Sequence, residues 1–187
     1  KMADKVGIEG HREFIKRIGL LDKITGLELP EIARPTEPSK WGKLSSITIS
    51  YGHGMSTTPL QTAVAAAALV NGGKLLPPTL LPRSRDEANE LAKSVVKPST
   101  SDKMRYLLRL NVLDGSGKRA EVPGFLVGGK TGTAEKPGVK GYDRGKLISS
   151  FVGAFPMDDP EYVVFVAIDE PKGQKESFKA CVNGKSL

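Results

Sequence analysis

One lysine lies in a short stretch of sequence that supports two different chemistries. Lys130 falls in residues 124–131, whose letters match the phosphate-binding pattern GxxxxGK[ST]. An apolar segment over residues 163–170 ends in Asp-Glu, like the acidic strand that helps to hold magnesium in nucleotide hydrolases. On pattern alone, the protein would be a P-loop nucleoside triphosphatase.

The residues around Lys130 argue against a nucleotide site. A phosphate loop must lead directly into a helix, because the free amides at the start of that helix hold the phosphates. Here Gly132 disfavours a helix and Pro137 would break one. The variable positions of the pattern are Phe-Leu-Val, which favour an extended strand. The alternative is therefore a strand that carries Lys-Thr-Gly-Thr over residues 130–133.

Such a strand could bind the end of an extended peptide and polarise a carbonyl group. Lys130 offers a fixed positive charge for a carboxylate, while Thr131 and Thr133 offer hydroxyl groups. Gly132 has no side chain, so a peptide could lie against the backbone there. The Thr133 amide could stabilise an oxyanion. Because neighbouring strand residues point to opposite faces, Lys130 and Thr131 can serve one site only on a twisted edge strand.

Several helices must position this strand. Thr58-Pro59-Leu60-Gln61 is a capping box with proline at the first helical position. It predicts a buried helix that runs to Val70 and ends at Asn-Gly-Gly. Apolar spacing predicts further helices over residues 11–18 and 100–112, whereas residues 24–43 are expected to form a long irregular excursion.

The second half of the chain changes to the periodicity of strands. Strands are predicted over residues 125–134, 147–155 and 162–168, and the last two are expected to form an antiparallel hairpin. The last strand has no polar alternation, so both of its faces should need a cover. Helices followed by consecutive strands indicate an α+β fold.

The Lys-Thr-Gly segment resembles the third active-site motif of penicillin-binding proteins. The match extends over residues 128–136, and three other segments resemble the family in the same order: 50–61 with its helix closed at 71–73, 148–156 and 163–171. The resemblance covers about residues 1–177 and is closest to class B, septal-type, proteobacterial peptidoglycan D,D-transpeptidases. It implies part of a penicillin-binding protein and serine β-lactamase-like fold, an antiparallel sheet flanked by helices.

These enzymes cross-link peptidoglycan stem peptides through a serine nucleophile, and β-lactams trap the acyl-enzyme. The resemblance implies that Lys130 helps to bind the substrate carboxylate and to position the serine of the second motif. Thr131 and Gly132 would contribute to substrate binding, and the Thr133 amide would form half of the oxyanion hole. Tyr51 and His53 would border the acyl-binding site, with His53 as a wall or binding residue rather than a catalytic one.

The nucleophile itself is not expected in this chain. The family places its Ser-x-x-Lys and Ser-x-Asn motifs before the region that matches residue 1. Ser94 has the right spacing to Lys97, but it lies too close to the Lys-Thr-Gly strand and Pro98 follows at once, so the match is interpreted as chance. Residues 1–178 are expected to be the C-terminal portion of a transpeptidase domain, inactive alone, and residues 179–187 a divergent or truncated tail. A pseudoenzyme or non-catalytic binding domain of the same fold is the remaining alternative.

The resemblance also implies a setting for the parent protein. Its partners would be stem peptides, β-lactams and the divisome proteins of the septum. It would act at the periplasmic face of the bacterial inner membrane, anchored by an N-terminal helix that is not present here. No cofactor or metal is expected.

Composition agrees with a folded domain and excludes several other classes. The 187 residues carry a net charge of +7, but the basic residues are scattered and aromatics are only 6%, so no nucleic-acid surface is expected. The single cysteine, Cys181, excludes an internal disulfide and a cysteine-based zinc site. The longest apolar run, residues 63–70, is too short for a membrane span. His11 is expected to lie on the surface.

Overall fold

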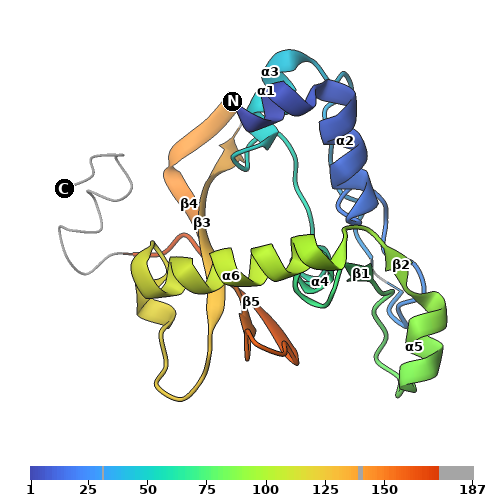
Figure 1. Cartoon of the computed structure of the whole chain (residues 1–187). Coiled ribbons are helices and arrows are strands. Elements are labelled where there is room, and N and C mark those ends of the chain that lie inside the picture. Colours follow the sequence, from blue (N-terminus) through green and yellow to red (C-terminus); the bar gives the residue numbers. More distant parts are fainter. Residues whose placement is uncertain (31, 139–140, 173–187) are drawn as a thin grey trace.

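Figure 1 shows the computed structural model of the chain, an α+β arrangement in which helices accompany a three-stranded antiparallel sheet. The structure describes residues 1–30, 32–138 and 141–172. Its elements follow in the order α1 (Met2–Val6), α2 (Ile8–Arg17), α3 (Lys43–Ile49), α4 (Pro59–Val70), β1 (Lys74–Leu75), α5 (Arg85–Leu91), β2 (Lys93–Ser94), α6 (Pro98–Asp114), the 3-10 helix η1 (Lys118–Ala120), β3 (Gly128–Gly138), β4 (Gly141–Phe155) and β5 (Tyr162–Asp169). The expected tail over residues 179–187 lies outside the described residues.

The main sheet has the strand order β3-β4-β5, with both pairs antiparallel. This confirms the predicted strands and the predicted final hairpin. Strand β3 begins three residues later than expected and ends four residues later. Strand β4 begins six residues earlier than expected, so β3 and β4 also form a hairpin. Lys130 lies opposite Val152 in the register. Within residues 1–30, 32–138 and 141–172, β3 pairs only with β4, and no other strand lies on its second edge.

Helix α4 begins as its sequence predicts. The Thr58 hydroxyl accepts a hydrogen bond from the Gln61 amide at 3.1 Å, and the Gln61 side chain accepts one from the Thr58 amide at 3.2 Å. Two glycines with φ near +90° follow the helix end, as a helix stop requires. Gln61 is only 1% exposed, and its Nε2 donates to the backbone oxygens of Asp22 at 2.8 Å and Gly19 at 3.3 Å. It thereby ties α4 to the segment after α2. The prediction of a helix buried all round holds only in part, because Leu60 is 37% exposed.

The other predicted helices are confirmed as α2 and α6, each somewhat longer than expected. Three short helices, α1, α3 and α5, were not predicted. The last of these starts with a capping box between Ser84 and Glu87, a signal that the sequence does contain. Among its described residues, the irregular excursion holds no helix or strand before α3 begins at Lys43, apart from a bridge between Thr36 and Ser56.

The core consists of three small apolar clusters rather than one. Two of them pack α2 and its following turn against α3, α4 and Val95. The third joins the end of α4 to the sheet through Val70, Ala154 and Met157, with Leu108 of α6 packed against it. The opposite face of β5 is open: Val164, Val166 and Ile168 are 42%, 50% and 56% exposed. Among the described residues, one face of β5 is packed at Val163 and no segment covers the opposite face.

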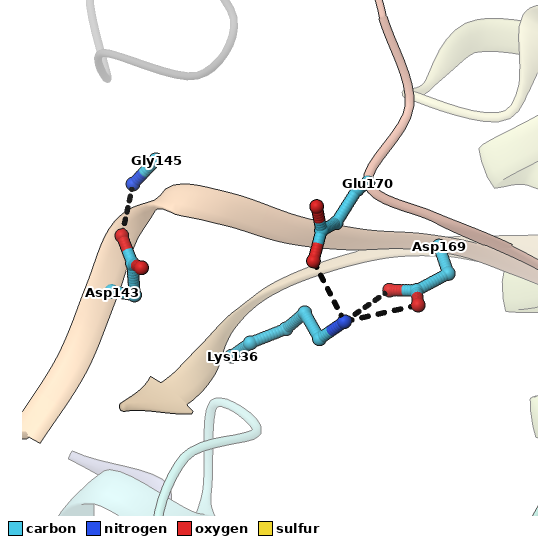
Figure 2. A network of polar contacts seen from close by, with 5 residues as sticks. All are labelled: Lys136, Asp143, Gly145, Asp169 and Glu170. Atoms are coloured by element: carbon cyan, nitrogen blue, oxygen red, sulfur yellow. Dashed lines mark hydrogen bonds and ion pairs between the residues drawn. The ribbon is translucent and has the colours of Figure 1, made fainter. Parts of the chain in front are cut away.

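A three-way ion pair links the far ends of the outer strands (Figure 2). Lys136 of β3 reaches Asp169 and Glu170 at the end of β5, and a β-bulge lies between Glu135 and Lys136. On the neighbouring stretch of β4, the Asp143 carboxylate accepts a hydrogen bond from the Gly145 amide at 2.9 Å. No helix within the described part of the chain has the length and apolar character needed to cross a membrane.

Candidate active site

Lys130 lies in an extended strand on the free edge of the sheet, as the second interpretation of its sequence predicts. Its ammonium group donates to the Thr131 carbonyl at 2.7 Å and lies 3.3 Å from the Thr131 hydroxyl. The long Lys130 side chain therefore lies along the edge of the strand, and its ammonium group comes close to the Thr131 hydroxyl. Residues 128–138 form β3 and not a helix, so the helix that a phosphate loop needs is absent. The nucleotide hydrolase interpretation is wrong.

Two side chains of helix α6 bind backbone carbonyls at and just before the start of β3. Arg109 Nη1 donates to the Val127 carbonyl at 2.8 Å, and Asn111 Nδ2 donates to the Gly129 carbonyl at 2.7 Å. Arg109 is itself fixed by two hydrogen bonds to Glu121. These bonds hold the pKa of the Glu121 carboxyl below its ordinary value and raise the pKa of Arg109, so the pair stays ionised.

The same contacts show which backbone groups face the free edge. In an antiparallel pair, successive residues alternate between facing the partner strand and facing away. The carbonyls of Val127, Gly129 and Thr131 accept hydrogen bonds from side chains outside β4, so the odd-numbered residues face away from it. By this alternation the Thr133 N–H also faces the free edge, which is the orientation that an oxyanion donor requires.

Two glycines of the segment meet different surroundings. A Cβ atom on Gly129 would lie 2.5 Å from the Val152 carbonyl and against the Phe151 ring, so only glycine fits while β3 and β4 keep this spacing. A Cβ atom on Gly132 would meet the Ser150 hydroxyl at 2.7 Å, a side chain that could turn aside. The expected role of Gly132 in receiving a peptide stays a prediction.

The loop that contains Tyr51 and His53 reaches the hairpin at a different point. The His53 ring packs edge-on against Tyr142 of β4 at 5.2 Å between centroids, and the Gly54 amide donates to the Tyr142 hydroxyl at 2.9 Å. Tyr51 completes the group, 5.5 Å from His53. Tyr142 lies opposite residue 137, seven residues beyond Lys130, or roughly 23 Å along an extended strand.

The structure therefore brings Tyr51 and His53 together and onto the hairpin. No described contact joins them to Lys130. The sequence analysis did not identify Tyr142, which contacts the loop at His53 and Gly54. In the sequence, only its position between two predicted strands pointed to a place on the hairpin.

A cavity of about 1000 Å³ reaches the main sheet at Val152 of β4. It is bounded by α1, α2, the segment after α3, and α4, and Val152, the register partner of Lys130, forms part of its wall. The Ser94 side chain does not face this space. It lies on β2 and lines another cavity, of about 720 Å³, between α2 and the β1-β2 pair. Its location gives no support to a nucleophilic role.

His11 departs from its expected place on the surface. Its Nδ1 lies 2.7 Å from the hydroxyl of Ser46, a buried residue, and its ring stands edge-on to Trp41 at 6.0 Å. The surface prediction holds only in part: His11 is half-buried, because its partner comes from a helix 35 residues away that the sequence pattern did not reveal.

Comparison with known proteins gives one consistent result. The penicillin binding protein transpeptidase domain family matches residues 1–183. A probable peptidoglycan D,D-transpeptidase FtsI of Caulobacter vibrioides is 40% identical over 195 residues, which cover 98% of this chain and 32% of that protein. The chain thus spans about a third of this relative's length.

Solved structures agree. The transpeptidase domain of Burkholderia pseudomallei penicillin-binding protein 3 aligns with a TM-score of 0.85 at 33% identity, covering 98% of this chain and 55% of that one. Penicillin binding protein 3 of Mycobacterium tuberculosis, complexed with ampicillin, aligns with a TM-score of 0.79 at 27% identity, covering 90% and 41% of the two chains.

Proposed function

Because the chain belongs to the penicillin-binding protein transpeptidase family, we propose that residues 130–133 form one wall of a peptidoglycan D,D-transpeptidase active site. One observation carries this proposal. The Lys130 ammonium, the Thr131 hydroxyl and, by strand alternation, the Thr133 N–H gather along an edge of the sheet to which no strand in the described part of the chain is paired. An extended peptide ending in a carboxylate fits such an edge, because it can add to the strand and place its charge at the lysine.

The reaction is an acyl transfer in two steps. A serine hydroxyl attacks the carbonyl between the last two D-alanines of a stem peptide, its proton passes to a base, and D-alanine leaves as the C–N bond breaks. An amine of a second stem then attacks the acyl-enzyme, forms the new amide and releases the serine. In this proposal Lys130 and Thr131 hold the terminal carboxylate, and the Thr133 N–H stabilises the oxyanion of each tetrahedral intermediate.

The serine belongs to another part of the full protein under this proposal. The chain spans about a third of the Caulobacter relative, and the proposal places the serine in the part of the full protein that this chain does not match. The cavity beside Val152 is a space in which a nucleophile-bearing segment would come close to Lys130. Tyr51 and His53 would border the acyl side of the substrate.

The proposal extends to the setting of the parent protein. The resemblance to septal-type enzymes supports action at the periplasmic face of the inner membrane, with an N-terminal anchor and divisome partners. The ampicillin complex of the Mycobacterium protein supports recognition of β-lactams by this chain's parent.

The test is a chimera. The transpeptidase domain of Burkholderia pseudomallei penicillin-binding protein 3 receives this chain in place of its matching segment, and acylation by a fluorescent penicillin is followed on gels. We expect the chimera to be labelled, and Lys130→Ala to slow labelling at least tenfold, because a charge-assisted hydrogen bond contributes about 1.5–3 kcal/mol. Lys103→Ala, on α6, is the matched control and should label normally.

A shorter graft of residues 98–172, from α6 to the end of the described chain, guards against a chimera that fails to fold. A folded chimera that takes no label would overturn the proposal. The 187-residue chain by itself should form no stable adduct. A covalent band that disappears on Ser94→Ala would instead make Ser94 a nucleophile.

A further inference from the structure

A hydroxyl outside the Lys-Thr-Gly motif touches the site directly. Ser116, in the turn after α6, lies with its Oγ 2.9 Å from the Thr131 Oγ1. On its other side the Ser116 hydroxyl lies 3.4 Å from Asn111 Oδ1. Together with the Lys130 ammonium, 3.3 Å from the Thr131 hydroxyl, these contacts form a row of polar groups from Lys130 to Asn111.

The turn that presents Ser116 is built around Asn111. The amides of Gly115 and Gly117 both donate to the Asn111 carbonyl, at 2.9 and 3.2 Å. A Cβ atom on Gly115 would lie 2.7 Å from that carbonyl and would also strike the Asn111 side chain, so the turn closes this tightly only with glycine. Ser116 itself is an exposed residue.

The orientation of the Asn111 amide is set by its partners. Its Nδ2 must face the Gly129 carbonyl, which can only accept, so Oδ1 faces the turn and can accept from Ser116. Asn111 therefore holds the backbone before Lys130 with one end of its side chain and the Ser116 hydroxyl with the other.

We propose that Ser116 is a positioning residue for carboxylate recognition, acting through the Thr131 hydroxyl; this rests on the proposed function. Thr131 Oγ1 accepts from Lys130 and has one proton to give. When a carboxylate arrives, that proton turns to the anion, and the Ser116 hydroxyl leaves its long contact with Asn111 to donate to Thr131. Thr131 then accepts from two donors, which strengthens the bond that it gives to the anion.

If Ser116 has this role, its effect depends on whether the ligand carries a negative charge. A negative charge gains more from a polarised donor than a neutral acceptor does, because charge-assisted hydrogen bonds are about twice as strong as neutral ones. A serine that only stabilised the turn would affect charged and neutral ligands alike. The two roles are therefore separated by ligand charge.

The experiment uses the chimeric transpeptidase domain with benzylpenicillin and its methyl ester, each in competition with fluorescent penicillin. We expect Ser116→Ala to lower the acylation rate constant for benzylpenicillin by roughly 3- to 10-fold, the size of one hydrogen bond. The ester, which has no charge at this position, should lose less than twofold. Ser116→Thr should restore the acid rate, and Ser94→Ala, a serine on β2, should change neither.

A double-mutant cycle with Thr131→Val gives a second readout. If Ser116 acts through Thr131, Ser116→Ala costs nothing further once the Thr131 hydroxyl is gone. Equal losses for acid and ester, no loss for the acid, or a full loss in the Thr131→Val background would each overturn the inference. A folded chimera that takes no label at all would overturn the proposed function instead, so the two failures are distinguishable.

Discussion

The ammonium of Lys136 on β3 lies 2.9 Å from Oδ1 of Asp169 at the end of β5, although β4 separates the two strands. It also lies 3.0 Å from the Glu170 carboxylate. The hydrogen bonds to Asp169 and then to Glu170 raise the pKa of Lys136 above its ordinary value. The outer strands are thus pinned together across the central one, at the end where β3 carries its bulge.

This ion pair predicts a pH-dependent contribution to stability. A group whose pKa is raised by folding stabilises the folded state fully below its unfolded pKa, about 10.4 for lysine. The contribution is lost as the pH rises through the higher folded value. In the chimeric domain, Lys136→Met should lower the urea midpoint at pH 7, with a smaller effect in high salt. The difference between variant and parent should shrink as the pH rises above the unfolded pKa of lysine and through the raised folded pKa; a constant difference would contradict the ion-pair explanation.

Removal of the buried Gln61 amide should be strongly destabilising. Gln61→Met keeps the length of the side chain but removes the donor to the Asp22 and Gly19 carbonyls and the acceptor for Thr58. Leaving buried polar groups unpaired costs about 1–3 kcal/mol each, so we expect a loss of roughly 2–4 kcal/mol in the free energy of unfolding. Thr58→Ala should cost about 1 kcal/mol as a lost helix cap. The double variant should lose less than the sum, since the two share hydrogen bonds.

Gly129→Ala should separate the Lys-Thr-Gly strand from its neighbour. The new methyl group would overlap the Val152 carbonyl and the Phe151 ring, and such overpacking costs about 1–3 kcal/mol. Because the carbonyl of Gly129 is also the group that Asn111 holds, acylation of the chimera should fall as well. Gly10→Ala, within α2, would bring a methyl group 3.1 Å from the side chain of Val6, which is exposed and can turn aside, so this variant should be neutral or stabilising by up to about 1 kcal/mol. Normal labelling by Gly129→Ala would contradict the tight register.

The open face of β5 should govern the behaviour of the isolated chain. Val164, Val166 and Ile168 are roughly half exposed there, and full burial of one such side chain contributes about 1.5–3 kcal/mol. Because each is about half exposed, the three together forgo roughly 2–5 kcal/mol, a substantial part of a net stability of about 5–15 kcal/mol. We expect the 187-residue chain to aggregate or to bind an apolar dye in size-exclusion and melting experiments. Val166→Lys should reduce dye binding, whereas Val163→Lys, on the packed face, should not.

A soluble monomer with one sharp melting transition and no dye binding would contradict this expectation, and would favour a pseudoenzyme or binding domain that is stable by itself.

Local signals were sufficient for the parts of the fold that local chemistry determines. The capping box at Thr58 fixes the start of α4, and the glycine and proline after Lys130 exclude a phosphate-loop helix. The short helices α1 and α3 were missed, because they depend on packing against α2 more than on their own patterns. The helix α5 was not predicted, although the sequence contains its capping box at Ser84 and Glu87.

The sequence predicted the residues of the candidate site that belong to recognisable motifs, but not the residues that support them. Arg109 and Asn111 bind backbone carbonyls, and a carbonyl has the same chemistry at every residue, so no sequence pattern marks these contacts. Ser116 escaped notice for a related reason. Its partner Thr131 is fifteen residues away, and a turn serine between two glycines is common in any loop.

Helix α6 fixes the position of β3 through hydrogen bonds to backbone carbonyls, so this position does not depend on which side chains the bonded residues carry. Arg109 and Asn111 hold carbonyls at positions 127 and 129, so a substitution of the Val127 side chain leaves these anchor points in place. A side chain outside the motif can therefore change while the positions of these carbonyls stay fixed. Substitution of Arg109 or Asn111 would do the reverse, moving an unchanged motif. Substitutions should therefore be tolerated at Val127 and selected against at Arg109, at Asn111 and within the Lys-Thr-Gly motif.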